Sequence, residues 1–71
     1  MNKNYFSSED FLEDVKHQIK IKYNNQESYA KSKGYSRKSL NRILNNGDDL
    51  SIGLINLFCY DFDLKIENYL F

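Results

Sequence analysis

The side chains best suited to chemistry in this sequence are cations and amides gathered in residues 36–45. Arginine can bridge guanine O6 and N7, lysine can reach the same acceptors or a phosphate, and asparagine can pair with adenine. Leu40, Ile43 and Leu44 would lie on one face of a helix, so the polar residues would project from the other. That polar face comprises Lys38, Asn41, Arg42 and Asn45, with Arg37 flanking it at the first turn.

The charges of the chain cancel but are segregated. Ten basic and ten acidic residues give no net charge, yet residues 16–42 carry eight basic residues against Glu27 alone. The flanking segments, 1–15 and 43–71, are both acidic. The basic middle segment favours binding to a polyanion, whereas the acidic end segments favour binding to a basic protein surface.

No catalytic or metal-binding apparatus is visible. The sequence has no phosphate-cradling glycine loop and no Ser-His-acid arrangement, and its carboxylates occur in runs that helix caps explain. His17 is the only histidine, and Cys59 stands among aromatic residues where a small buried side chain is expected. We therefore expect no enzyme, no cofactor and no metal site.

The length of 71 residues allows one small domain, residues 1–71. One cysteine cannot form an internal disulfide, and no apolar run approaches the roughly 20 residues of a membrane span or the layout of a secretory signal. We expect a protein of a reducing cytoplasm, without membrane contact.

The first helix is predicted from Ser7 to about Lys22. Ser7 can cap it, and Phe6 can pack on Phe11 as a hydrophobic staple. Apolar residues then recur at helical spacing and would face the core; they are Phe11, Leu12, Val15 and Ile19. Its first turns carry four acids, Glu9, Asp10, Glu13 and Asp14, which suit the helix dipole and solvent.

A tight bend is predicted between a second and a third helix. Asn25 can cap a short helix from Gln26 that turns Tyr29 and Ala30 inward, Gly34 supplies the left-handed residue that ends it, and Ser36 can cap the helix that follows. Residues 45–49 form the strongest loop signal, after which Asp49 or Ser51 can cap a fourth helix.

The fourth helix is apolar on more than one face, which predicts the centre of the core or half of a subunit contact. A short last helix should follow, with Leu64, Ile66, Tyr69 and Leu70 as its apolar residues. Four aromatic residues near the end could supply a dimer or partner surface, although core packing is the ordinary alternative for each. They are Tyr60, Phe62, Tyr69 and Phe71.

The stretch from Asn25 to Leu44 resembles the Cro and phage-repressor family of helix-turn-helix regulators, often called the XRE family. The small Ala30, the turn residue Gly34 and the apolar Leu40 and Ile43 carry the resemblance. Weaker similarity extends over the first helix and the two last helices.

Two features depart from the family pattern. Lys33 stands where an apolar residue is usual, which should weaken packing of the second helix, and the loop at 45–47 is one residue longer.

This resemblance implies an all-α, Cro-like (lambda-repressor-like) bundle of about five short helices whose recognition helix spans about residues 37–45. Gln26 would contact or orient a phosphate, Arg37 and Lys38 would begin the recognition helix, and Arg42 would sit one turn further on. Ser36 or Ser39 could bond a phosphate oxygen. The partner would be double-stranded operator DNA, bound by a homodimer.

Three functions are compatible with this resemblance. The first is a phage or bacterial regulator that occupies an operator in a genetic switch such as the lysogeny switch. The second is an antirepressor that uses the same fold to mask the DNA-binding domain of a phage repressor; zero net charge and two acidic ends motivate it. The third is a toxin–antitoxin or plasmid regulator of the same fold.

Overall fold

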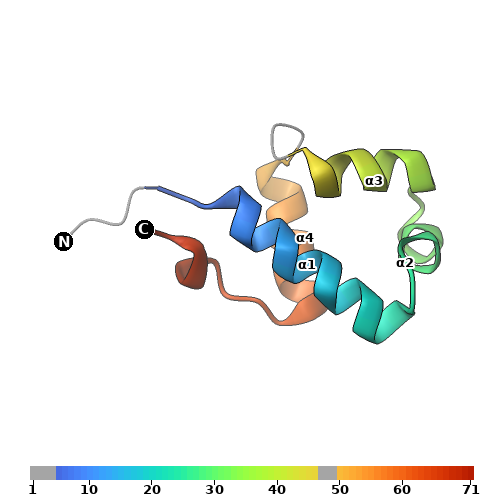
Figure 1. Cartoon of the computed structure of the whole chain (residues 1–71), viewed down its shortest axis with the longest axis horizontal. Coiled ribbons are helices and arrows are strands. Elements are labelled where there is room, and N and C mark those ends of the chain that lie inside the picture. The colour runs from blue at the N-terminus through green and yellow to red at the C-terminus, as the bar shows by residue number, and fades with distance from the viewer. Residues whose placement is uncertain (1–4, 47–49) are drawn as a thin grey trace.

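The fold is a bundle of short helices (Figure 1). A computed structural model describes residues 5–46 and 50–71. Its elements are α1 (Ser8–Tyr23), α2 (Gln26–Lys33), α3 (Arg37–Asn45), α4 (Ile52–Phe62) and one 3-10 turn, η2 (Ile66–Tyr69). No strand occurs in these two segments. The all-helical expectation is confirmed with four α-helices, and the expected fifth helix is the single turn η2.

The predicted start of α1 is confirmed. The Ser7 hydroxyl accepts a hydrogen bond from the Asp10 amide at 3.3 Å. Phe6 and Phe11 pack with ring centroids 5.5 Å apart, as a hydrophobic staple does. The helix ends where Asn24 takes a positive φ of 71°, a conformation that asparagine tolerates better than most residues.

A tight bend joins α2 to α3, and each residue predicted to form it does so. Asn25 Oδ1 accepts from the Ser28 amide at 2.8 Å, which caps α2. Gly34 lies in the left-handed region with φ of 77°, and a Cβ there would meet no atom within 4 Å, so its backbone angle and not space demands glycine. Ser36 Oγ then accepts from the Ser39 amide at 3.1 Å and caps α3.

Helix α4 begins at the second of its two predicted caps. Ser51 Oγ accepts from the Leu54 amide at 3.2 Å. Asp49, the other candidate, lies outside the described residues, as does Gly47 of the loop.

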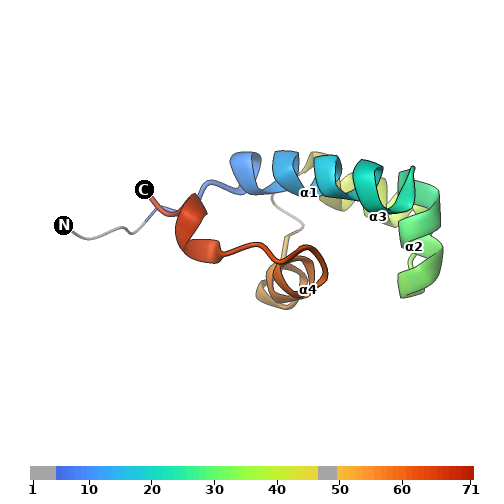
Figure 2. The same cartoon turned by 90° about the horizontal axis from the view of Figure 1, so that it is seen from below.

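The centre of the core is α1, not α4. Four residues of α1 are buried (Phe11, Leu12, Val15 and Ile19), whereas α4 fully buries only Phe58 and Phe62. Figure 2 shows why: α4 lies on one side of the layer that α1 and α3 form, so its other face has no neighbour among the described residues. Ile52 is accordingly 77% exposed. The first alternative for α4, the centre of the core, is therefore wrong, whereas the second, half of a subunit contact, stays a prediction.

Two aromatic residues predicted as partner surface belong to the core. Phe62 stacks on Phe58 at 6.4 Å, and Tyr69 packs edge-on against Phe11 at 5.1 Å. The Tyr69 hydroxyl donates to Asp14 Oδ2 at 2.6 Å. Burial, followed by this bond to a carboxylate, raises the pKa of Tyr69. Neither side chain can meet a partner, so this part of the expected surface is corrected.

An ion pair replaces the poor packing expected at Lys33. The Lys33 ammonium lies 3.0 Å from Asp61 Oδ2, and Tyr29 donates its hydroxyl to the same oxygen at 2.7 Å. The Asp61 side chain is 8% exposed, so this cluster ties α2 to α4 inside the bundle. Burial and the Asp61 bond raise the pKa of Tyr29, and the bond to Asp61 raises that of Lys33. The folded chain therefore favours neutral Tyr29 and charged Lys33.

The first and last described residues are held together, which no local pattern indicated. Phe6 and Leu70 form an antiparallel bridge. The Tyr5 amide donates to the Phe71 carbonyl at 3.1 Å, and the Phe71 amide donates back at 2.7 Å. This contact closes the bundle beneath α1 and keeps Tyr69 in the core.

Candidate functional site

The polar face predicted for α3 is present. Arg37, Lys38, Asn41, Arg42 and Asn45, which we call the α3 polar face, are all exposed. On the opposite side Leu40 and Leu44 are buried, and Ile43 is half-buried against the core. The helix is thus anchored by aliphatic side chains and offers donors to solvent, as predicted.

Some polar groups of the α3 polar face are hydrogen-bonded to one another. Asn45 Nδ2 donates to the Asn41 carbonyl and to Asn41 Oδ1, both at 2.8 Å. This arrangement orients the Asn41 amide so that its nitrogen, a donor, is left for a ligand. The two predicted serines are exposed at the start of the helix, where Ser36 donates its hydroxyl to Ser39 at 2.9 Å.

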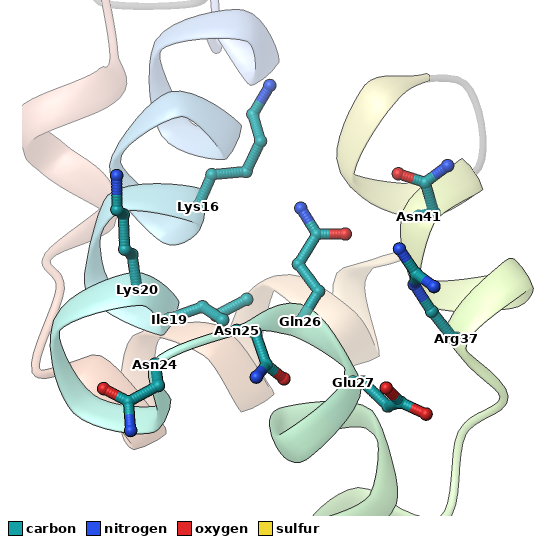
Figure 3. A pocket seen from close by; sticks show the side chains of 9 residues that line it. All are labelled: Lys16, Ile19, Lys20, Asn24, Asn25, Gln26, Glu27, Arg37 and Asn41. Atoms are coloured by element: carbon teal, nitrogen blue, oxygen red, sulfur yellow. The ribbon is translucent and has the colours of Figure 1, made fainter.

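An open cleft of about 670 Å³ adjoins this face (Figure 3). Lys16 and Lys20 of α1 stand on one wall, and Arg37 and Asn41 of α3 stand on the other. Gln26, at the start of α2, rises between them. The remaining lining residues are Ile19, Asn24, Asn25 and Glu27. The structure therefore places three of the predicted binding residues, Gln26, Arg37 and Asn41, at one site. Lys38, Arg42 and Asn45 are on the same helix as Arg37 but do not line the cleft.

The two lysines of α1 were missed by the sequence analysis. Their spacing of four residues puts them on one side of α1, and they contribute to the basic middle of the chain. The spacing and the charge of these lysines were visible in the sequence. The sequence of α1 does not indicate, however, that the side carrying them lies next to the start of α2 and to α3.

Positive charge dominates the cleft. Three cations line it against one acid, Glu27. Lys16 is partly engaged, since its ammonium lies 3.7 Å from Glu13 Oε2 and 3.5 Å from Asn45 Oδ1. Walls of low dielectric that carry one sign of charge focus the field into the space between them, which attracts anions.

A second hollow, of about 410 Å³, is lined by two acids and by one lysine, Lys16, which also lines the first cleft. It lies between the first turns of α1 and the end of α3, and the exposed Glu9 and Glu13 stand on its rim. Buried Leu12 and Leu44 lie behind them. Two of the four acids of α1 therefore line this hollow, and none of the four lines the basic cleft.

The expected aromatic partner surface is reduced to Tyr60 and Phe71, which are 87% and 60% exposed. They belong to different elements, α4 and the C-terminal segment. Ile52, which the sequence analysis did not single out for this role, lies two helical turns before Tyr60 and is also exposed. Other large apolar side chains are exposed elsewhere in the described residues, namely Tyr5, Ile21 and Ile66, so the exposed apolar residues do not form one expected surface.

Other kinds of site find little support in residues 5–46 and 50–71. They contain no group of three or more His, Cys, Asp or Glu side chains placed to hold a metal ion. Cys59 is half-buried, and burial raises the pKa of its thiol. None of the helices described has the length and apolar character that crossing a membrane requires.

Comparison of the chain with protein-family models, with curated proteins and with solved structures found no match in any of the three. The chemistry of its own residues is what points to a function.

Proposed function

We propose that this chain is a DNA-binding transcriptional regulator of a phage or bacterial genetic switch. The observation that carries the proposal is the α2–Gly34–α3 unit: a short helix, a left-handed glycine and a second helix whose donors all face solvent. A second helix presented in this way is the element that enters the major groove in helix-turn-helix proteins.

In this proposal each part of the site contacts a different part of the DNA. Lys38, Asn41 and Arg42 read base edges from α3, where arginine suits guanine and asparagine suits adenine. Ser36, Ser39 and Gln26 lie toward the phosphates, which position the helix without reading sequence. The chain acts by occupying an operator, without catalysis or a cofactor. As a homodimer it would place its two α3 helices about 34 Å apart, on successive major-groove faces.

Fluorescence anisotropy with a labelled duplex, selected from a random pool and measured across a salt series, tests this function. We expect affinity to fall with salt with a log–log slope of about −0.9 per neutralised phosphate, and the selected duplex to bind at least about 10³-fold more tightly than random DNA. Binding that is absent up to tens of micromolar, or equal for all sequences, would contradict a sequence-specific regulator.

A second candidate is a modulator that binds the DNA-binding domain of a repressor and blocks its access to an operator. The second hollow favours it, because the exposed Glu9 and Glu13 offer negative charge to a basic protein surface. This function predicts no specific duplex, tight binding to such a domain, and loss of that binding in a Glu9→Lys, Glu13→Lys variant.

A further inference from the structure

We propose that Lys20 of α1 and Arg37 of α3 form a phosphate clamp, which holds the sugar-phosphate backbone of one DNA strand between the two walls of the cleft. The clamp rests on the proposed DNA-binding function. It adds a contact from α1, an element that the resemblance to helix-turn-helix regulators did not assign to the partner.

The first support is that neither cation has a competing partner in the part of the chain that the structure describes. Three other lysines of α1 and α2 are engaged: Lys16 with Glu13 and Asn45, Lys22 over the Phe62 ring at 5.8 Å, and Lys33 with Asp61. Within residues 5–46 and 50–71, the side chains of Lys20 and Arg37 make no hydrogen bond and no ion pair. Their charges are therefore available to an anion.

The second support is the arrangement of donors. Figure 3 shows Lys20 and Arg37 on opposite walls, with the Gln26 amide between them and Asn41 beside Arg37. Ammonium, guanidinium and amide groups all donate hydrogen bonds, and phosphate oxygens accept them. The cleft is open and adjoins the α3 polar face, so a polymer strand can pass through it while its bases reach α3.

The third support is the position of Arg37 in its own helix. The first turn of α3 carries Arg37 and Lys38 and no acid. A cation near a helix N-terminus opposes the helix dipole, so this placement weakens the folded chain slightly. A bound phosphate would reverse that effect, because it neutralises the cation and itself favours the helix N-terminus.

The test compares Lys20→Gln with Lys22→Gln in the full chain. Both variants remove one charge from the same helix, but Lys22 does not line the cleft. We expect Lys20→Gln to reduce the log–log salt slope by about 0.9 and to weaken selected and random duplexes alike, by about three- to tenfold near 0.1 M salt. Lys22→Gln should leave the slope unchanged, Lys20→Arg should restore it, and urea unfolding should confirm that each variant folds.

The outcomes separate the clamp from the function. If the unmodified chain binds duplex DNA and Lys20→Gln keeps its full slope, or Lys22→Gln lowers the slope equally, the clamp is wrong and the DNA-binding function stands. If the unmodified chain binds no duplex in a salt-dependent way, both proposals fail.

Discussion

Replacing Arg37 with glutamate should abolish detectable binding of duplex DNA while the chain stays folded and becomes slightly more stable. Arg37 lines the cleft and begins the α3 polar face, so the change removes one donor to phosphate and adds a repelling carboxylate. In the folded chain the same carboxylate lies at the N-terminal end of α3, where it favours the helix dipole. The free energy of unfolding should therefore rise by about 0.3–1 kcal/mol.

Opposite changes in binding and stability distinguish a functional residue from a structural one. Anisotropy measures the first and urea unfolding the second. Lys65→Glu is the matched control, because it makes the same change of charge at an exposed position just before η2, away from the cleft. A variant at Arg37 that binds as tightly as the unmodified chain, or one that unfolds, would contradict this role.

Replacing Phe58 with alanine should have the largest effect on stability. Phe58 is fully buried and its ring lies 6.3 Å from Phe11 and 6.2 Å from Tyr29, so it joins α4 to both α1 and α2. Truncating a buried phenylalanine costs about 3–5 kcal/mol. The free energy of unfolding of a domain of this size is roughly 4–11 kcal/mol, so this substitution would remove a large part of it.

Tyr60→Ala provides the control on the same helix. Tyr60 lies two residues further on and is 87% exposed, so its truncation should change stability by less than about 0.5 kcal/mol. Far-ultraviolet circular dichroism during urea unfolding measures both variants. Equal effects would contradict the orientation of α4. Loss of stability in Tyr60→Ala that appears only at high protein concentration would instead indicate that this side chain contacts a second copy.

The parts of the fold that depend on neighbouring residues were predictable from the sequence. Ser7, Asn25 and Ser36 cap the helices that were expected to begin after them, and Gly34 has the left-handed backbone that ends α2. Each of these involves groups within four residues of one another. The spacing of Leu40 and Leu44 similarly determined which side of α3 faces solvent.

Contacts between distant residues were not predictable in this way. Asp61 meets Lys33 across 28 residues, and Tyr69 meets Asp14 across 55. No periodicity within either partner signals such a pair. The same holds for the candidate site. The exposed residues of α3 could be predicted from the periodicity of that helix alone. Lys20 lines the cleft only because α1 packs beside the start of α2, which no local pattern indicates.

The proposed function requires the α3 polar face and the adjoining cleft to contact DNA. Titrating the ¹⁵N-labelled chain with a selected duplex, and following its backbone amide resonances, tests this most directly. We expect the largest shifts at Arg37, Lys38 and Asn41, with smaller ones at Lys20 and Gln26 and none at Tyr60. Shifts confined to the acidic turns of α1 or to the outer side of α4, with α3 unchanged, would contradict the account.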